Sequence, residues 1–545
     1  MTYTVQRTVG GPTTRWYEGE WVFSSMLIDR AERFGDGTAV HSRRGDVTWS
    51  GLVERAERVA GFLERLGIDP GDRVATLIPS TIDYMAAWHG INWRNAIDVP
   101  INNEYKGAFL EHQLRDSGAR ALVIDGRWID RLNQIELSGD LEHVIVWGSP
   151  EAELPSGVSG HAFADALAAD PGALVPRDES DLTYIMYTSG TTGPAKGGVH
   201  NNRSTIWYAM PFIEGLDLVD DDICYSMFPL FHQMGRTACS TTAWFVGNPV
   251  VLREGFSASG FWDDLAECQA TWMGYFGAVV LFLWNQDPSP ADSAHAMRRA
   301  FGSSAPRELI DPWEERFGVT LYEVYGSTEL GLGSGLGPGY GRMKLGTTGQ
   351  ICHQVEVKIV DENDDPVPPG TVGEAVWRPN YPDAIYLGYW SNPQATVDAW
   401  KNLWFHSGDA GYLDEEDNFV FKDRIKDAIR RRGENISSFA VEESVRGLQG
   451  VLEVAAYAVK HEHADTEEEV AIAVVPHPDG GPDPEELFRT LCETMPRHTV
   501  PRYLRIMDEF PKTPTQRVQK VKLRDAGITP DTYDREAMGI FPPKE

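Results

Sequence analysis

A loop rich in glycine, serine and threonine occupies residues 187–198, which read YTSGTTGPAKGG. Glycines let backbone N–H groups approach phosphate oxygens closely, hydroxyl side chains add donors, and Lys196 supplies a mobile positive charge. The Walker A loop has Gly-Lys followed by Ser or Thr, whereas Lys196 follows Ala195 and precedes Gly197. The stretch therefore predicts an anion-binding loop of a different kind, and the alternative is a surface turn of unusual composition.

The elements around this loop are predicted to alternate between strands and helices. Residues 182–187, LTYIMY, read as a strand that leads into the loop. A helical pattern at residues 50–68, with Ser50 as the expected N-cap, precedes a strand pattern at residues 72–79. Because this alternation continues from about residue 25 to residue 300, it predicts the α/β fold class, with parallel sheets covered by helices.

The pattern changes in the second half of the chain. Residues 345–425 alternate strand patterns with Pro, Gly and Asp turns, which predicts a β-rich subdomain. The pattern resets near Lys426, and a helix capped by Asp483 is expected beyond it. We therefore expect a large N-terminal domain over residues 1–425 and a small α+β domain over residues 426–545.

Charge and composition exclude several classes of partner. The 81 acidic and 49 basic residues give a formal net charge of −32, which argues against nucleic acid and anionic membranes as main partners. The spacings of the five cysteines suit neither a zinc site nor a disulfide framework. The first residues lack the apolar segment of a signal peptide, and no stretch of ~18 apolar residues occurs. We expect a cytoplasmic protein with reduced thiols.

Further motifs follow the glycine-rich loop along the chain. Residues 324–329 read VYGSTE, residues 404–411 read WFHSGDAG, and residues 423–437 read DRIKDAIRRRGENIS. Together with the loop, and in this order, they resemble the nucleotide, ribose and hinge motifs of the adenylate-forming superfamily. That superfamily holds acyl-CoA synthetases, firefly-type luciferases and non-ribosomal adenylation domains. The resemblance covers about residues 25–525.

The resemblance implies a reaction in which ATP activates an acid, releasing pyrophosphate and leaving an acyl adenylate, which most members then transfer to a thiol. Thr328 would contact the α-phosphate and Glu329 would bind Mg²⁺, since one carboxylate plus phosphate oxygens suits that ion. By itself, Glu329 could equally be a solvated acid on a loop. The residues that match the phosphate loop are Thr188, Ser189, Gly190, Thr191, Thr192 and Lys196.

The resemblance also assigns residues to the nucleoside. Asp409 would accept hydrogen bonds from both ribose hydroxyls, with Arg424 assisting. Residues 301–306, FGSSAP, resemble the segment that flanks the adenine, with serines where glycines are commoner, and Tyr325 would stack near the base. The residues assigned to adenine and the α-phosphate are Ser303, Ser304, Ala305, Tyr325, Gly326, Ser327 and Thr328.

The acid would bind near residues 229–236, PLFHQMGR, which resemble the family segment whose histidine sits at the acyl site. His232 is the expected gate or wall residue, and the alternative is a core histidine bonded to a backbone carbonyl. The other expected wall residues, which could also be core residues, are Tyr275, Phe276 and Gly302.

The catalytic cation departs from the family pattern. Residues 511–520, PKTPTQRVQK, align with a motif that carries a glycine and a catalytic lysine, but Gln516 and Arg517 stand at those positions. Arginine keeps the charge and can contact two oxygens, although it is bulkier. We expect Arg517 to act in place of the lysine, and the alternatives are Lys520 and Lys512.

The hinge motif implies a C-terminal domain that rotates between the two half-reactions. Lys426 matches the hinge residue, and Gly433 would let the pantetheine arm of CoA approach closely. A cluster of basic residues would attract the phosphates of CoA, or else form a solvated helix end: Arg430, Arg431 and Arg432.

The leading interpretation is a free-standing acid–CoA ligase, because RRRGENISSFAVEE at residues 430–443 resembles the crotonobetaine/carnitine-CoA ligase branch. Aromatic wall residues favour an aromatic or bulky acid, as in the naphthoate-type ligases of antibiotic biosynthesis. One alternative is an adenylating enzyme that does not use CoA, and instead loads a carrier protein or activates nitrite for diazotisation. Another is a nucleotide-binding regulator without catalysis. A homodimer is a further expectation.

Overall fold

The computed structural model describes residues 20–188, 195–335, 337, 344–425, 429–431, 434–436, 438–461, 464–495, 497, 499–513 and 517–542. The chain divides into two compact units. Unit 1 comprises Met1–Glu356 and Trp377–Phe405, and unit 2 comprises Val357–Val376 and His406–Glu545. Within the described ranges, no helix combines the length and the apolar character that crossing a membrane requires.

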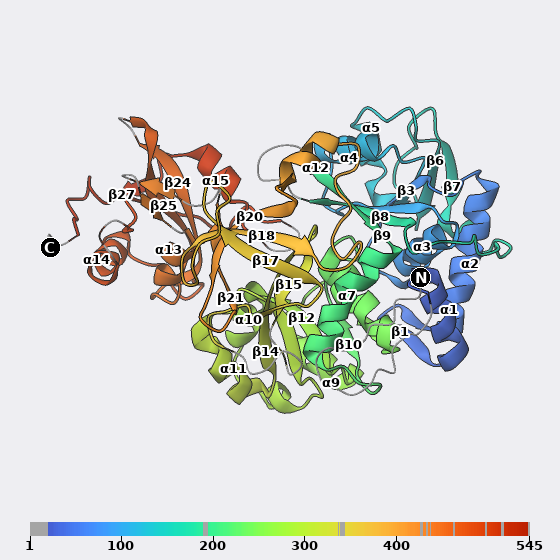
Figure 1. Ribbon diagram of the computed structural model, residues 1–545, viewed down its shortest axis with the longest axis horizontal. Helices are drawn as coiled ribbons and strands as arrows, with labels where there is room; N and C mark the ends of the chain where they lie inside the picture. Colours follow the sequence, from blue (N-terminus) through green and yellow to red (C-terminus); the bar gives the residue numbers. More distant parts are fainter. Residues whose placement is uncertain are drawn as a thin grey trace. The chain divides into compact units, whose positions relative to one another are not determined.

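The first sheet of unit 1 has seven strands in the order β7-β6-β5-β3-β4-β8-β9 (Figure 1). Every neighbouring pair is parallel except β8 and β9 at the edge, which are antiparallel. The strands are β3 (Arg73–Leu77), β4 (Ile97–Pro100), β5 (Ala121–Asp125), β6 (His143–Trp147), β7 (Ser159–Ala162), β8 (Leu182–Thr188) and β9 (Lys196–Asn201). The glycine-rich loop therefore joins the last two strands of this sheet.

The second sheet of unit 1 has nine strands in the order β16-β15-β14-β13-β12-β10-β11-β1-β2. Its strands run parallel from β1 to β14, and antiparallel strands complete both edges. The strands are β1 (Thr38–Ser42), β2 (Gly45–Thr48), β10 (Cys224–Ser226), β11 (Val250–Leu252), β12 (Trp272–Phe276), β13 (Arg299–Ser303), β14 (Thr320–Ser327), β15 (Gly331–Gly335) and β16 (Gln350–Ile351). The predicted α/β class with parallel sheets is confirmed.

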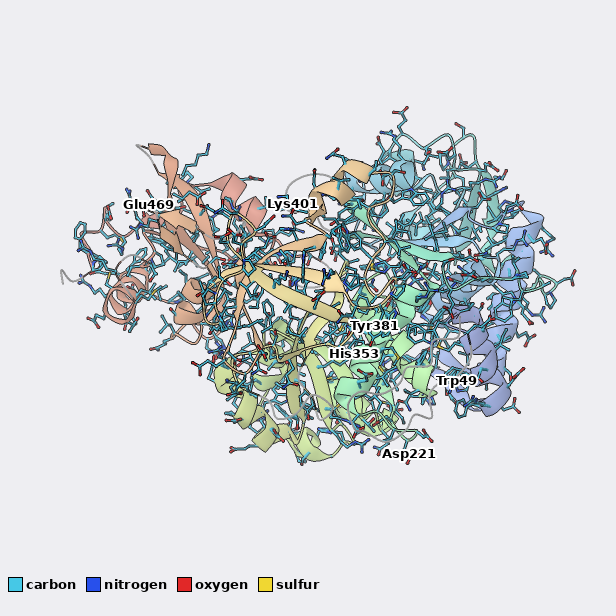
Figure 2. All side chains as sticks on the ribbon, in the orientation of Figure 1. Trp49, Asp221, His353, Tyr381, Lys401 and Glu469 are labelled. Atoms are coloured by element: carbon cyan, nitrogen blue, oxygen red, sulfur yellow. The ribbon has the colours of Figure 1, made fainter. Side chains whose placement is uncertain are left out.

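Helices connect and cover these strands. Helix α2 begins at Trp49, a buried residue labelled in Figure 2. Its N-cap is Thr48, whose side chain accepts a hydrogen bond from the backbone N–H of Gly51, so the prediction of Ser50 was wrong by two residues. The principal helices of unit 1 are α1 (Phe23–Phe34), α2 (Trp49–Arg65), α3 (Ile82–Trp93), α4 (Ala108–Ser117), α7 (Asn202–Leu216), α9 (Phe261–Cys268), α10 (Gly277–Trp284) and α11 (Ile310–Phe317).

A third sheet lies in the segment that the sequence predicted to be β-rich. Its strand order is β17-β18-β20-β19, with β21 paired to β20. Its strands are β17 (Val355–Val360), β18 (Gly373–Pro379), β19 (Trp400–Lys401), β20 (Trp404–Leu413) and β21 (Phe419–Arg424). The segment 345–425 is shared between the two units. Lys426, the expected boundary and hinge, lies outside the described residues, so that assignment stays a prediction.

The rest of unit 2 contains a four-stranded sheet, a small hairpin and helices. The sheet has the order β24-β25-β26-β27, and its apolar core includes Phe488 and Leu491 of α14. Helix α14 has the predicted N-cap, Asp483, whose carboxylate accepts from the N–H of Glu486. The elements are β22 (Ile429–Arg431), β23 (Glu434–Ile436), α13 (Ser438–Val445), β24 (Val451–His461), β25 (Ala464–Pro476), α14 (Pro484–Thr494), β26 (Tyr503–Ile506), α15 (Lys520–Ala526) and β27 (Thr532–Asp534).

Candidate functional site

The two ends of the glycine-rich loop face each other across a β-hairpin. Thr188 at the end of β8 pairs with Lys196 at the start of β9, and the Thr188 hydroxyl donates to the Lys196 carbonyl at 3.4 Å. The pairing fixes where the loop begins and ends. Four residues that the sequence assigned to the loop lie outside the described residues: Ser189, Gly190, Thr191 and Thr192.

One tyrosine connects the candidate phosphate cation with the candidate metal ligand. The ammonium group of Lys196 lies 5.0 Å from the ring centroid of Tyr389, within cation–π distance. The hydroxyl of the same Tyr389 donates to Oε1 of Glu329 at 3.0 Å. Burial, followed by the charge of Glu329, raises the pKa of Tyr389, so its hydroxyl stays protonated and remains a donor. The structure thus brings together Lys196 and Glu329, which the sequence assigned separately, through a tyrosine that sequence reasoning missed.

The turn that carries Glu329 follows strand β14. Thr328 is adjacent to the hairpin, since a Cβ added to Gly198 of β9 would lie 3.8 Å from its methyl carbon. The carbonyl of Glu329 accepts from the N–H of Tyr386 at 2.8 Å, which anchors the turn. Gly326 cannot carry a side chain here, because an added Cβ would lie 2.2 Å from the carbonyl oxygen of Gly331. The VYGSTE turn is therefore fixed by its neighbours on both sides, and Ser327 contributes by accepting from the N–H of Leu330.

Ring stacking holds Tyr325, the residue expected near the base. Its ring lies 5.5 Å from that of Trp377 with an interplanar angle of 19°, and its side chain is buried. One face of the ring therefore packs against a residue of unit 1.

A half-buried carboxylate organises the segment expected to flank the adenine. Oε2 of Glu323 accepts from the N–H of Ser304, and Oε1 accepts from the N–H of Ala305, both at 3.0 Å. Ser304 has a φ of +67°, a left-handed conformation that costs free energy for a residue other than glycine. Burial raises the pKa of Glu323 to about 6, although hydrogen bonds from Tyr275, Ala305 and Ser304 oppose the shift. Glu323 was not predicted, and its signal was a single acid within the strand TLYEVYGS.

The segment around Ser303 and Ser304 is also packed closely against strand β12. A Cβ added to Gly302 would lie 2.1 Å from the carbonyl oxygen of Tyr275, and one added to Gly277 would lie 1.9 Å from the carbonyl oxygen of Ser304. Both glycines are thus required by the approach of two backbones. For Gly302, this accounts for the residue type without any contact to an acid.

The expected walls of the acid site separate into two groups. Successive residues of a strand point to opposite faces, and Tyr275 and Phe276 are successive in β12. The ring of Phe276 contacts Phe228 at 5.0 Å and His232 at 6.3 Å between centroids. Tyr275 is completely buried and donates to Glu323. The structure therefore brings His232 together with Phe276, and connects Tyr275 through Glu323 to the backbone of Ser304 and Ala305.

A buried ion pair supports the chain that follows His232. The π-helix η2 (Met234–Thr241) contains Arg236, which donates to Asp98 of β4 at 2.5 Å, and both side chains are fully buried. The guanidinium also lies 4.1 Å from the ring centroid of Trp88. π-Helices are rare and occur frequently at functional sites. Nδ1 of His232 accepts from the N–H of Met234 at 3.1 Å, so the imidazole is oriented by the same turn.

In unit 2, the predicted ribose ligands lie opposite each other on neighbouring strands. Asp409 of β20 pairs in register with Arg424 of β21, and their side chains form an ion pair of 3.5 Å. The N–H of Asp409 donates to the hydroxyl of Ser407 at 3.2 Å. Asp409 is mostly buried, whereas the Arg424 side chain is 40% exposed. The structure brings these two predicted residues together.

The three candidate catalytic cations have different surroundings within unit 2. Lys512 forms an ion pair with Glu453 at 2.6 Å, and Lys520 forms one with Glu442 at 2.7 Å. Arg517 is exposed, and its N–H donates to the hydroxyl of Thr513 at 3.1 Å. Both lysines are therefore held by carboxylates of their own unit.

Arg431 has the contacts of a structural residue. Its guanidinium is buried and forms an ion pair of 2.8 Å with the buried Glu469, which is labelled in Figure 2. It also donates to the carbonyl of Val500 at 3.2 Å. These contacts compensate its charge inside unit 2, and its expected role toward CoA stays a prediction. The side chains of Arg430 and Arg432, and Gly433, lie outside the described part of the chain.

Parallel sheets, a loop rich in glycine and threonine, and a carboxylate linked to the end of that loop are typical of nucleotide-binding α/β proteins. A family model described as AMP-binding enzyme matches residues 27–390, and one described as AMP-binding enzyme C-terminal domain matches residues 440–517. The first match covers more than half of the chain, so the chain belongs to the AMP-binding enzyme family. This confirms the family predicted from the motifs.

Known relatives extend along almost the whole chain. Crotonobetaine/carnitine–CoA ligases of Salmonella arizonae and Salmonella typhimurium are each 30% identical, over 92% of this chain and 98% of the relative. Among solved structures, an anthranilate CoA ligase in complex with anthranoyl-AMP has a TM-score of 0.83 at 23% identity, covering 94% of this chain and 98% of its own. A benzoate CoA ligase from Burkholderia xenovorans LB400 has a TM-score of 0.80 at 24% identity, covering 92% and 99%. These two likenesses confirm the fold.

Proposed function

We propose that this chain is an ATP-dependent acid–CoA ligase. A carboxylate oxygen attacks the α-phosphorus of ATP, the bond to the β-phosphate breaks, and acyl-AMP and pyrophosphate form. The sulfur of CoA then attacks the acyl carbon, and AMP leaves. The observation that carries the proposal is the link of Lys196 and Glu329 through Tyr389, in a chain 30% identical to CoA ligases over 92% of its length.

Unit 1 contributes the groups that hold the triphosphate. Lys196 neutralises phosphate charge at one end of the hairpin loop, and the hydroxyl of Thr328 donates to the α-phosphate. Glu329 would hold Mg²⁺, a hard cation that prefers carboxylate and phosphate oxygens and that would neutralise phosphate charge when bound. Tyr389 orients the Glu329 carboxylate through its hydrogen bond and supports Lys196 through its ring. The loop residues Ser189, Gly190, Thr191 and Thr192 belong to the same proposal.

The proposal assigns separate residues to the ribose and to the adenine. Asp409 accepts hydrogen bonds from the two ribose hydroxyls, and Arg424 lies beside it in an ion pair of 3.5 Å. The adenine lies against the segment of Ser303, Ser304 and Ala305, whose backbone is fixed by Glu323.

Arg517 supplies the positive charge for adenylation. It stabilises the negative charge that develops between the carboxylate and the α-phosphate, as a lysine does in the family pattern. Its position in the family motif and its exposed side chain support this role. Lys426 serves as the hinge, and Arg430, Arg431, Arg432 and Gly433 serve CoA.

The acid is proposed to be aromatic. Phe228, His232 and Phe276 form a cluster of rings that offers edges and faces to a flat acyl group. A cytoplasmic location and a homodimeric assembly are part of the proposal, and light scattering tests the assembly.

The deciding experiment has two measurements on the purified chain. Pyrophosphate release is followed over a panel of benzoates, naphthoates, fatty acids and short acids, and thioester formation is then followed by mass spectrometry after CoA is added. We expect release and thioester with the same aromatic acids. Pyrophosphate release without any thioester would overturn CoA ligation. Because Arg517 departs from the family pattern, two alternatives are then tested without CoA. One is a carrier protein as the acceptor of the acyl group, and the other is nitrite as the acid, with an arylamine as its acceptor. ATP binding without pyrophosphate exchange would indicate a regulator.

A further inference from the structure

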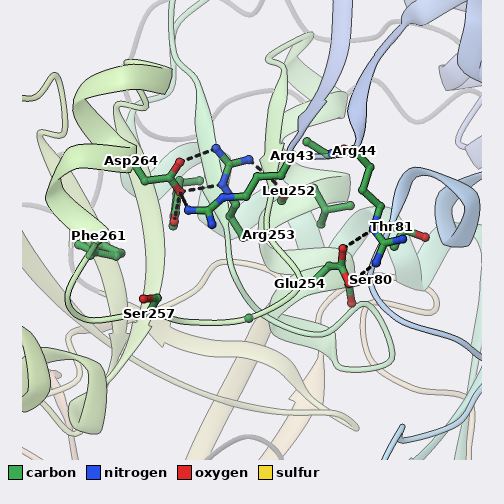
Figure 3. Close-up of a pocket in the computed structure, with 14 residues that line it drawn as sticks. Arg43, Arg44, Ser80, Thr81, Leu252, Arg253, Glu254, Ser257, Phe261 and Asp264 are labelled. Carbon is green, nitrogen blue, oxygen red and sulfur yellow. Dashed lines mark hydrogen bonds and ion pairs between the residues drawn. The ribbon is translucent and has the colours of Figure 1, made fainter.

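A cavity of about 260 Å³ opens within unit 1, away from the residues assigned above (Figure 3). Ser42 at the end of β1, Tyr225 in β10 and Leu252 at the end of β11 line it. These three strands are neighbours and run parallel, so the cavity lies at their carboxyl ends. In open α/β sheets, ligands bind at this edge.

Arginines from two chain segments converge on this cavity. Arg253 donates to both carboxylate oxygens of Asp264 at 2.7 Å, and Arg44 donates to both oxygens of Glu254 at 2.6 and 3.1 Å (Figure 3). Arg43 lies 3.7 Å from Asp264, beyond hydrogen-bond distance, and its side chain is 71% exposed. Asp264 and Glu254 thus fix Arg253 and Arg44. The ion pair of Arg43 with Asp264 is too long for a hydrogen bond, so it leaves the N–H donors of Arg43 for another acceptor.

The balance of charge in the cavity is positive. Three guanidinium groups face two carboxylates, Glu254 and Asp264, so the lining carries a formal charge of one positive unit. The whole chain carries −32, and an anion is therefore met by a local concentration of donors and not by the overall field. Guanidinium groups bind phosphate through paired hydrogen bonds.

The cavity is connected to the segment of the proposed acid site. Oγ of Ser80, a lining residue, accepts from the N–H of Leu230 at 2.9 Å, and Leu230 is two residues before His232. Tyr225 of the lining and Phe228 of the aromatic cluster are likewise close in sequence, at the end of β10. A ligand anchored here would lie beside the chain that leads to the acyl group.

We propose that this cavity binds phosphate groups at the nucleotide end of CoA, with Arg43 as the principal donor and Arg44, which Glu254 positions, as the second. This site adds to the attraction for CoA proposed for residues 430–432. The proposal rests on the proposed function, because it assigns a site to the thiol co-substrate of that reaction. The arginines hold the phosphates by charge and hydrogen bonding, and take no part in the adenylation of the acid.

The test compares two thiol acceptors in variants of the cavity. Arg43→Ala, Arg43→Glu and Arg43→Ala/Arg44→Ala are measured with CoA and with pantetheine, which lacks the nucleotide. The matched control is Arg489→Ala, which removes an arginine from another exposed ion pair, with Glu485. We expect Arg43→Glu to raise the KM for CoA about ten-fold or more, because a charge-assisted contact is replaced by repulsion. The KM for pantetheine, the rate of pyrophosphate exchange without thiol and all values of the control stay unchanged.

A CoA KM that does not move in Arg43→Glu and in the double variant overturns the proposal, and so does an equal rise for pantetheine. If the wild type exchanges pyrophosphate but forms no thioester, the proposed function has failed, and a binding measurement decides the cavity separately. Adenosine 3′,5′-bisphosphate is titrated calorimetrically into protein saturated with AMP. Binding that is lost in Arg43→Glu supports a phosphate site, and absence of binding overturns it.

Discussion

The hydroxyl of Tyr275 donates a hydrogen bond of 2.7 Å to Oε1 of Glu323. The same carboxylate accepts from the backbone of Ser304 and Ala305, so one side chain joins strand β12 with the segment proposed to contact adenine. Tyr275 is the neighbour of Phe276, which belongs to the aromatic cluster. The aromatic cluster is therefore connected to the segment proposed to contact adenine through Tyr275 and Glu323.

Glu323→Gln should weaken ATP binding more than it slows catalysis. A glutamine side chain has a single acceptor oxygen, so it cannot accept from both backbone N–H groups and Tyr275 as the carboxylate does. We expect the KM for ATP to rise by about five- to twenty-fold, equivalent to one or two lost hydrogen bonds, with kcat changed less. Tyr275→Phe, which removes one donor and keeps the ring, should give a smaller rise. An unchanged KM for ATP in both variants would contradict the role of Glu323.

The dependence of stability on pH should report the same carboxyl. Its pKa in the folded protein is raised from 4.5 to about 6. The folded state therefore binds the proton more tightly than the unfolded state, and the stabilisation is complete below the unfolded pKa and is lost as pH rises through about 6. We expect a loss of up to about 2 kcal/mol in the free energy of unfolding from this group between pH 4.5 and 6.5. Urea denaturation measures the free energy of unfolding of the wild type and of Glu323→Gln at each pH. Between pH 4.5 and 6.5 the wild type should lose up to about 2 kcal/mol more than the variant. Equal changes with pH in the two proteins would refute the prediction.

Tyr389→Phe should affect the metal requirement of adenylation. The variant keeps the ring over Lys196 but removes the hydroxyl that donates to Glu329. We expect kcat/KM for pyrophosphate exchange to fall about ten-fold, which corresponds to one lost hydrogen bond to a charged group. We also expect the Mg²⁺ concentration at half-maximal activity to rise, because Glu329 loses the hydrogen bond that orients it. Tyr389→Leu should lose more, because the cation–π contact is removed as well. Equal activities of the two variants would show that the ring contact contributes nothing.

Arg517→Lys should retain or raise adenylation, since it restores the family residue at that position. Arg517→Ala should lower pyrophosphate exchange by about a hundred-fold or more, as expected when a charge that stabilises the transition state is removed. Lys512→Ala and Lys520→Ala break ion pairs inside unit 2 and should act mainly on thermal stability. Total loss of activity in Arg517→Lys would show that Arg517 does not stand in for the lysine.

Arg236→Met should destabilise the protein strongly. The substitution leaves Asp98 buried without its cation, a change that typically costs about 3–5 kcal/mol. Burial raises the pKa of Asp98 and Arg236 lowers it, so the variant should unfold more readily at pH 8 than at pH 6, where the carboxyl can be neutral. Asp98→Asn/Arg236→Met removes both charges and should recover part of the loss. A single variant as stable as the wild type would mean that the pair has no anchoring role.

Local patterns were sufficient to predict the class of fold and the candidate motifs. The strand that precedes the glycine-rich loop and the N-cap Asp483 each depend on residues close together in the sequence. The alternation of strands and helices that predicted the parallel sheets is also a local pattern. Glu323 and Tyr389 could not be predicted in the same way, because their partners lie 18 or more residues away, and 60 residues separate Tyr389 from Glu329. Only folding places them in contact. The opposite orientations of Tyr275 and Phe276 required the position of β12 in the sheet.

The buried pair of Asp98 and Arg236 anchors the backbone at the proposed acid site without using the residues proposed to contact the acid. It secures η2 to strand β4 through side chains that do not belong to the aromatic cluster of Phe228, His232 and Phe276. The rings of the cluster can therefore be exchanged for smaller or larger ones while the backbone beneath them keeps its anchor. For protein engineering, this makes positions 228, 232 and 276 the place to build a library of altered acid preference, with positions 98 and 236 left untouched.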